Sequence, residues 1–165
     1  MKIRTEADIV ELEKVPVGER IRHRNVLDIL RDSGRTHADR IAFRFLSGTT
    51  PADPVRDVSY AEMLKQVIQA ANLFHASGVG PDDTVTLLLP GVPETFIALW
   101  GAEIGAVANP VNYFLNASQI AGIMKEAGTR AVVAADPSLF ADIWPKVEEI
   151  RRLLPGLKVF RVGGK

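Results

Sequence analysis

The feature that most constrains the fold is a regular alternation of short apolar segments with longer amphipathic ones. The short segments are rich in apolar residues and are separated by helical patterns: residues 84–89, 106–108, 130–135 and 157–162. Short apolar runs are expected for strands that are covered on both faces, and strands joined by helices favour a parallel sheet with right-handed crossovers. The sequence therefore predicts an α/β protein with three layers, a mainly parallel sheet of about four strands with helices on both faces. Numbered along the chain, the strands are expected in the order 2-1-3-4.

Capping residues set the expected limits of the helices. Ser59 and Glu62 match a capping box, in which the Ser59 hydroxyl accepts from a helical amide and the Glu62 carboxylate reaches back to the cap. Gly78 is expected to end the helix that follows. A later helix is predicted to begin at Asp136, and Pro145 inside it is expected to kink or split it.

The N-terminal part of the chain differs in character from the rest. Residues 1–24 are charged and aperiodic, which predicts a tail or an arm that wraps the surface. Asn25 has the chemistry of a helix cap, so a short helix is expected over residues 26–33, ended by Gly34. Residues 25–165 are then expected to form a single α/β unit.

A hairpin is predicted between the arm and the sheet. Residues 41–46 read as a strand, and residues 47–54 contain one glycine and two prolines, which are typical of a loop. Residues 55–58 can return as the partner strand. The predicted fold is therefore the α/β unit with a short N-terminal arm and a hairpin.

Composition excludes several classes of protein. Lys plus Arg and Asp plus Glu are both 20, and no basic stripe with interleaved aromatics is present, which argues against a nucleic-acid partner. The longest apolar stretch, residues 96–110, is interrupted by Glu103 and is too short to span a bilayer. The chain has no cysteine, so it has no disulfide and no thiolate zinc site. We expect a cytoplasmic protein without a membrane span.

The candidate functional residues follow one predicted strand. Ligands of doubly wound sheets approach the carboxyl ends of the strands, and the loop at the end of residues 106–108 contains two amides and two aromatics: Asn109, Asn112, Tyr113 and Phe114. These are predicted to lie on the substrate side. The alternative is that the asparagines satisfy backbone groups and the aromatics pack. No catalytic, cofactor-binding or metal-binding residue is identified.

The glycines and histidines are weaker candidates for functional sites. Gly78 and Gly80 follow a helix and precede a strand, the reverse of a phosphate-binding loop, so a helix end and a turn are expected. Gly101 and Gly105 are expected to serve close helix–sheet packing and a helix end. Each histidine lacks a second ligand four residues later, so structural or surface roles are expected for His23, His37 and His75.

Four short segments resemble motifs of one enzyme family, in the same order. They are VSYAEML (58–64), similar to L-T-Y-x-E-L; GVGPDDTV (78–85), similar to G-V-x-x-G-D-x-V; LLPGVPE (88–94), similar to L-L-P-N-x-x-E; and WGAEIGAVANPVN (100–112), similar to G-A-x-x-A-G-A-V-x-x-P-x-N. Asp82 stands where the second motif has glycine, and Gly91 stands where the third has asparagine. Together the motifs resemble the adenylate-forming, AMP-binding family of acyl-CoA synthetases, luciferases and adenylation domains, with fatty-acyl or aryl-CoA ligases the nearest branch.

The resemblance implies a two-step reaction. A fatty or aromatic carboxylate attacks the α-phosphate of ATP with magnesium, giving an acyl-adenylate and pyrophosphate, and the CoA thiol then displaces AMP. The implied cofactors are ATP, magnesium and CoA. The family's Ser/Thr/Gly-rich loop ending in Pro-Lys, its later Thr-Glu, its ribose-binding Asp and its C-terminal Lys have no match in this sequence.

The chain is therefore expected to be an N-terminal fragment of such a ligase. Residues 25–165 would be the first α/β subdomain of the large N-terminal domain, truncated at its C-terminal end. On its own it would be inactive and bind no cofactor. Its partner would be the remainder of its own enzyme, and exposed apolar surface could lead to oligomers.

Two other classes of protein remain open at this point. A self-contained receiver-like module needs acids after its first strand, and a flavodoxin-like module needs a hydroxyl-rich loop there. The segment from Leu89 to Pro93 provides neither. A purely structural interaction domain is the other alternative. A Ser/Thr-Gly-rich loop ending in Pro-Lys, encoded beyond Lys165, would separate these interpretations.

Overall fold

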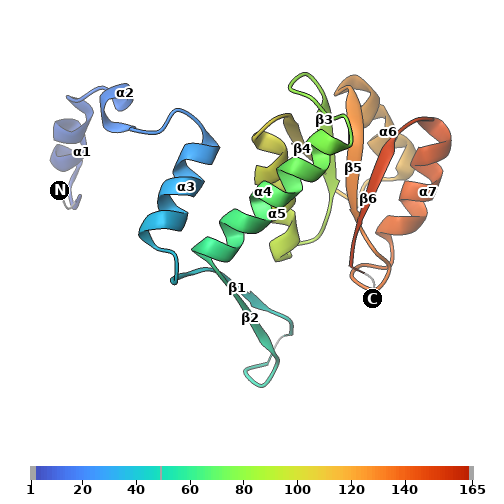
Figure 1. The fold of residues 1–165 in the computed structure, drawn as a ribbon, viewed down its shortest axis with the longest axis horizontal. Helices are drawn as coiled ribbons and strands as arrows, with labels where there is room; N and C mark the ends of the chain where they lie inside the picture. Colours follow the sequence, from blue (N-terminus) through green and yellow to red (C-terminus); the bar gives the residue numbers. More distant parts are fainter. Residues whose placement is uncertain (1–2, 49, 164–165) are drawn as a thin grey trace.

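A four-stranded parallel sheet forms the centre of the molecule. The computed structural model describes residues 3–48 and 50–163. The strands are β3 (Thr84–Leu88), β4 (Val107–Pro110), β5 (Thr129–Ala135) and β6 (Lys158–Val162). Their order is β4-β3-β5-β6, and each neighbouring pair is parallel (Figure 1). This confirms the predicted α/β fold and the predicted strand order 2-1-3-4.

Helices cover both faces of this sheet, which confirms the three layers. Figure 1 shows α6 and α7 on one side and α4 and α5 on the other. Their bounds are α4 (Tyr60–Ala76), α5 (Pro93–Glu103), α6 (Ala117–Glu126) and α7 (Ile143–Leu153). β3 is buried along its whole length because both of its faces are covered. Within the described ranges, no helix has the length and hydropathy that crossing a bilayer requires.

The predicted hairpin is present and is anchored by aromatic packing. β1 (Ile41–Leu46) and β2 (Val55–Ser59) pair antiparallel. Phe43 stacks against Phe96 and Trp100 of α5, with ring centroids 5.4 and 5.7 Å apart. Offset aromatic packing of this kind adds stability beyond the buried area. The hairpin is therefore held on the main body at the start of α5.

The N-terminal arm contains two helices that the sequence pattern did not predict. It contains α1 (Glu6–Glu13) and α2 (Val17–Arg20), and neither helix buries a residue. The Thr5 hydroxyl accepts from the Asp8 amide, and the Asp8 carboxylate accepts from the Thr5 amide at 2.9 Å. Figure 1 shows both helices lying apart from the sheet. Local capping bonds stabilise such helices, and apolar periodicity does not reveal them.

Gly34 does not end its helix, contrary to the prediction. α3 (Val26–Thr36) starts at the predicted cap, Asn25, and continues through Gly34. A Cβ atom at Gly34 would lie 2.7 Å from Cδ2 of Leu64 in α4. A larger residue at this position would have to displace the Leu64 side chain, so the role of Gly34 is close packing of α3 on α4 rather than helix termination.

The helix predicted from Asp136 begins seven residues later, at Ile143. The Asp136 carboxylate accepts from the Ser138 amide at 2.8 Å, so the side chain closes a local turn and does not cap a helix. Pro145 then falls in the first turn of α7, where a missing N–H leaves no helical bond unmade. α7 is therefore a single helix, whereas a kinked or split helix was expected.

The start of α4 follows the predicted cap only in part. Ser59 accepts from the Glu62 amide at 3.2 Å, as expected. The Glu62 carboxylate instead accepts from Nε2 of Gln66 at 2.7 Å, one turn further along the helix. Gly78 ends the segment with φ of 75°, as predicted, because glycine adopts this left-handed conformation without steric cost.

Candidate functional site

The candidate residues lie at the carboxyl end of β4, and the strand extends to Pro110, two residues beyond the predicted end, so Asn109 belongs to the strand itself. The Asn109 side-chain amide donates to Oγ1 of Thr86 in β3 at 3.1 Å. Oγ1 of Thr86 also shares a 2.8 Å hydrogen bond with Oγ1 of Thr129 in β5. These three side chains form a polar network across three strands. Asn109 thus anchors the start of the loop instead of pointing freely outward.

The other three candidates order the loop itself. Oδ1 of Asn112 accepts from the Phe114 amide at 3.0 Å, a turn that asparagine closes on its own backbone. The rings of Tyr113 and Phe114 pack on Phe140, with centroids 5.0 and 6.4 Å away. Nζ of Lys146 donates to the Tyr113 carbonyl at 2.6 Å. The alternative considered from sequence, backbone satisfaction and packing, therefore describes most of these contacts.

Phe114 departs from that pattern because it is largely exposed. Its relative exposure is 74%, although it belongs to the aromatic group with Tyr113 and Phe140. The structure thus places Asn109 in β4 and the other three candidates in the loop that follows it, and Phe114 has the largest surface available to a ligand. Their substrate-side role stays a prediction.

Removing the Thr86 hydroxyl should show how much the polar network stabilises the fold. Thr86→Val keeps the shape of the side chain but leaves Nδ2 of Asn109 and Oγ1 of Thr129 without this buried partner. The free energy of unfolding is expected to fall by about 1–2 kcal/mol, the usual cost of an unsatisfied buried polar group. Urea denaturation measures the change, and Thr86→Ser, which retains the hydroxyl, is the control. Equal stability of the two variants would contradict a role for the hydrogen bonds.

Asp136 is a charged residue at this edge, and sequence reasoning assigned it to a helix cap at the carboxyl end of a predicted strand. It follows β5 directly and is only 7% exposed. Nε of Arg161 lies 3.1 Å from its Oδ2 atom, and the Arg161 guanidinium lies 5.4 Å from the centre of the Trp144 ring. Hydrogen bonds from the Ser138 amide and hydroxyl, helped by the charge of Arg161, hold the Asp136 pKa below its ordinary value of 3.8. An acid immediately after an apolar strand was the signal that could have indicated this cluster.

This lowered pKa predicts a specific pH dependence of stability. The unfolded chain binds the Asp136 proton more tightly than the folded chain, so the stabilisation is present above about pH 4 and is lost as pH falls through the lower folded pKa. Asp136→Asn should be less stable than the wild type at neutral pH, and the difference should shrink in acid. Urea denaturation at several pH values tests this, with Asp142→Asn as the control for an exposed aspartate. A difference that is independent of pH would refute the assignment.

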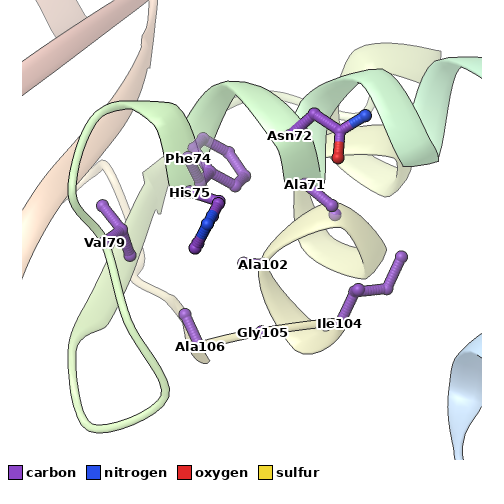
Figure 2. A pocket seen from close by; sticks show the side chains of 10 residues that line it. Ala71, Asn72, Phe74, His75, Val79, Ala102, Ile104, Gly105 and Ala106 are labelled. Carbon is purple, nitrogen blue, oxygen red and sulfur yellow. The ribbon is translucent and has the colours of Figure 1, made fainter.

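Among the cavities that the described residues form, two lie at opposite ends of the sheet. The first, the hairpin cavity, has a volume of about 300 Å³ and lies among Phe45, Val55, Val92, Leu139, Val162 and Gly163. It lies beside the end of β6, at the carboxyl edge. The second has a volume of about 220 Å³ and is formed by the ends of α4 and α5 and the segments before β3 and β4. Figure 2 shows His75 at this second cavity, among mostly apolar side chains.

The described residues do not fit a nucleotide–metal site. Among residues 3–48 and 50–163, no group of three or more His, Asp or Glu side chains is placed to hold a metal ion. Nε2 of His23 lies 3.4 Å from Asp32, and the His37 ring packs on Tyr60 at 5.9 Å. The turn from β3 to α5 is Pro-Gly-Val-Pro, which lacks the hydroxyl and lysine groups of a phosphate loop.

Comparisons with solved structures agree with this architecture. The anthranilate CoA ligase AuaEII, solved in complex with anthranoyl-AMP, superposes with a TM-score of 0.74 at 22% identity, over 91% of this chain and 27% of that one. This likeness shows the fold. The N-terminal domain of FACL13 from Mycobacterium tuberculosis has a TM-score of 0.67 at 25% identity, over 85% of this chain and 34% of that one.

Sequence comparisons identify the family. Marinolic acid–CoA ligase of Pseudoalteromonas sp. (strain SANK 73390) is 35% identical over 149 residues, 90% of this chain and 23% of that protein. The chain thus spans about a quarter of the length of this relative. The family model for AMP-binding enzymes matches residues 30–160, which favours this family over a receiver-like or flavodoxin-like module. The chain belongs to the AMP-binding enzyme family.

Proposed function

We propose that this chain is the first α/β part of an ATP-dependent ligase that joins a carboxylic acid to CoA. The observation that carries the proposal is the 35% identity to an acid–CoA ligase over 90% of the chain. Residues 25–165 would be the first subdomain of the large N-terminal domain, and residues 1–24 its arm. ATP, magnesium and CoA would be cofactors of the longer enzyme, and a fatty or aromatic acid its substrate.

Within such an enzyme, this part would provide a rigid platform. The buried sheet and its anchored loop after β4 support this role, since the Asn109–Thr86–Thr129 network limits movement of the loop. Asn109, Asn112 and Tyr113 would hold the loop, and Phe114 would face the substrate side. The absence of cysteine agrees with the proposed location in the cytoplasm.

The proposed partner is the remainder of the same enzyme. Large apolar side chains are exposed on the hairpin, on β4 and in the candidate loop, among them Leu46, Val107 and Phe114. Exposed apolar surface of this kind is typical of a face that another segment covers. In the isolated chain the same surface would favour association with a second copy.

The isolated 165-residue chain is expected to be catalytically inactive, because the phosphate loop and the catalytic residues that the family resemblance implies have no match in its sequence. The assay is ATP–pyrophosphate exchange with a panel of fatty and aromatic acids, and the anthranilate CoA ligase serves as the active control. Exchange above background by this chain alone would overturn the prediction.

The ligase activity itself needs a separate test. The product of the complete coding region containing this sequence is expected to release AMP only when an acid, ATP and CoA are all present. Chromatographic detection of AMP and of the acyl-CoA measures this. Failure of every acid in the panel to give AMP would count against the proposed function.

A further inference from the structure

The hairpin cavity combines apolar walls with one charged rim. Its walls come from four separate parts of the chain: the hairpin, the segment before α5, the turn after β5 and the end of β6. The apolar side chains Phe45, Val55, Val92, Leu139 and Val162 contribute most of them. A volume of about 300 Å³ lies at the low end of the range for small-molecule sites. The cavity therefore suits a small, mostly apolar group.

The rim of the cavity carries Arg56 of β2 and Glu94 of α5. Nη1 of Arg56 lies 2.5 Å from Oε1 of Glu94, and both side chains are partly exposed. In the part of the chain that the structure describes, no hydrogen bond engages Nη2 or Nε of Arg56. A guanidinium has five N–H donors in a planar fork, so Arg56 can bind an anion with the donors that Glu94 does not use.

The position of this rim is defined by the packing around it. Phe43 of the hairpin stacks on Phe96 and Trp100 of α5, which fixes the hairpin beside the helix that carries Glu94. Gly163 also lines the cavity and has φ of 94°, so a residue with a side chain would be strained there.

We propose that the hairpin cavity binds a small amphipathic anion, with its apolar part against the walls and its charged head on Arg56. The apolar lining favours a hydrocarbon group, and the free donors of Arg56 select an anionic head over a neutral one. The location agrees with the tendency of such sheets to bind ligands at their carboxyl edge. The inference does not depend on ligase activity, and its test uses neither ATP nor CoA.

The experiment follows the backbone amide resonances of the 165-residue chain by NMR during titration with octanoate. Saturable shifts are expected at residues that line the cavity, such as Arg56, Val162 and Gly163, and 1-octanol should bind more weakly. Arg56→Gln should weaken octanoate binding about tenfold or more, the scale of a lost charge-assisted hydrogen bond. Arg44→Gln is the matched control, because Arg44 lies on the same hairpin and pairs with Asp57 instead.

Two further variants keep the test decisive if Arg56→Gln does not fold. Glu94→Gln removes the competing carboxylate, so octanoate should bind more tightly. Val55→Trp fills the cavity from a position that is 50% exposed, so it should abolish binding without unfolding the chain. The proposal is overturned if no saturable shift occurs at millimolar octanoate, if the shifts lie at the cavity of Figure 2 instead, or if the Arg56 and Arg44 variants bind equally.

Discussion

Ile120→Ala is expected to lower the free energy of unfolding by about 2–5 kcal/mol, the usual range for truncating a fully buried isoleucine. Ile120 lies on the face of α6 that packs on the sheet and is 0% exposed. Removing its side chain leaves a cavity between layers that are already closely packed, and the surrounding strands can close it only in part. Urea denaturation, followed by circular dichroism, measures the change.

The control is Ile123→Ala in the same helix. Ile123 is 40% exposed, so the same chemical change removes much less buried surface. We expect a loss below about 1 kcal/mol, since both variants gain the same helix propensity from alanine. If the two substitutions cost the same, Ile120 would not have the buried position that the structure describes.

Gly101→Val is the second change with a large expected effect. A Cβ atom at Gly101 would lie 2.7 Å from Cβ of Ala70, and 3.2 and 3.3 Å from the backbone of Ala71 and Val67. Backbone atoms of α4 cannot move aside as a flexible side chain can, so the two helices would have to separate. The expected loss is about 3 kcal/mol or more, the upper end for overpacking.

Gly122→Ala provides the matched comparison for Gly101. Gly122 is also inside a helix, α6, but a Cβ atom there meets nothing within 4 Å. Alanine should therefore stabilise the chain by about 0.5–1 kcal/mol, because it loses less backbone entropy on folding. Thermal and urea denaturation of both variants give the comparison. A stable Gly101→Val protein would show that α4 and α5 do not pack in this way.

Gly101 also corrects the sequence interpretation. The sequence predicted close helix–sheet packing at this glycine, whereas the structure shows contact with another helix, α4. Small residues in a helix indicate that something approaches closely, but they do not identify the neighbour. Gly34 is a similar case, since its close neighbour is Leu64 and the sequence predicted a helix end.

From the sequence, only the location of the candidate site could be predicted, and its contacts could not. The rule that ligands approach carboxyl ends of strands led to Asn109, Asn112, Tyr113 and Phe114, and the structure places Asn109 in β4 and the other three in the loop that follows it. The same rule could not predict that Asn109 binds Thr86, because that partner is 23 residues away in the chain. Arg56 and Glu94 are 38 residues apart in the chain, and no local pattern connects them.

The sequence by itself determined the class of fold, the order of its elements and the family, because these depend on local periodicity, capping residues and short motifs. Local signals also placed Asn25, Ser59 and Gly78 at helix ends, since a cap acts within a few residues of itself. Only the tertiary structure decided which glycines separate packed helices, where Asp136 finds Arg161, and how the hairpin encloses a cavity with Arg56 at its rim. Those contacts join residues far apart in the chain, and their strength depends on burial and distance, which exist only after folding.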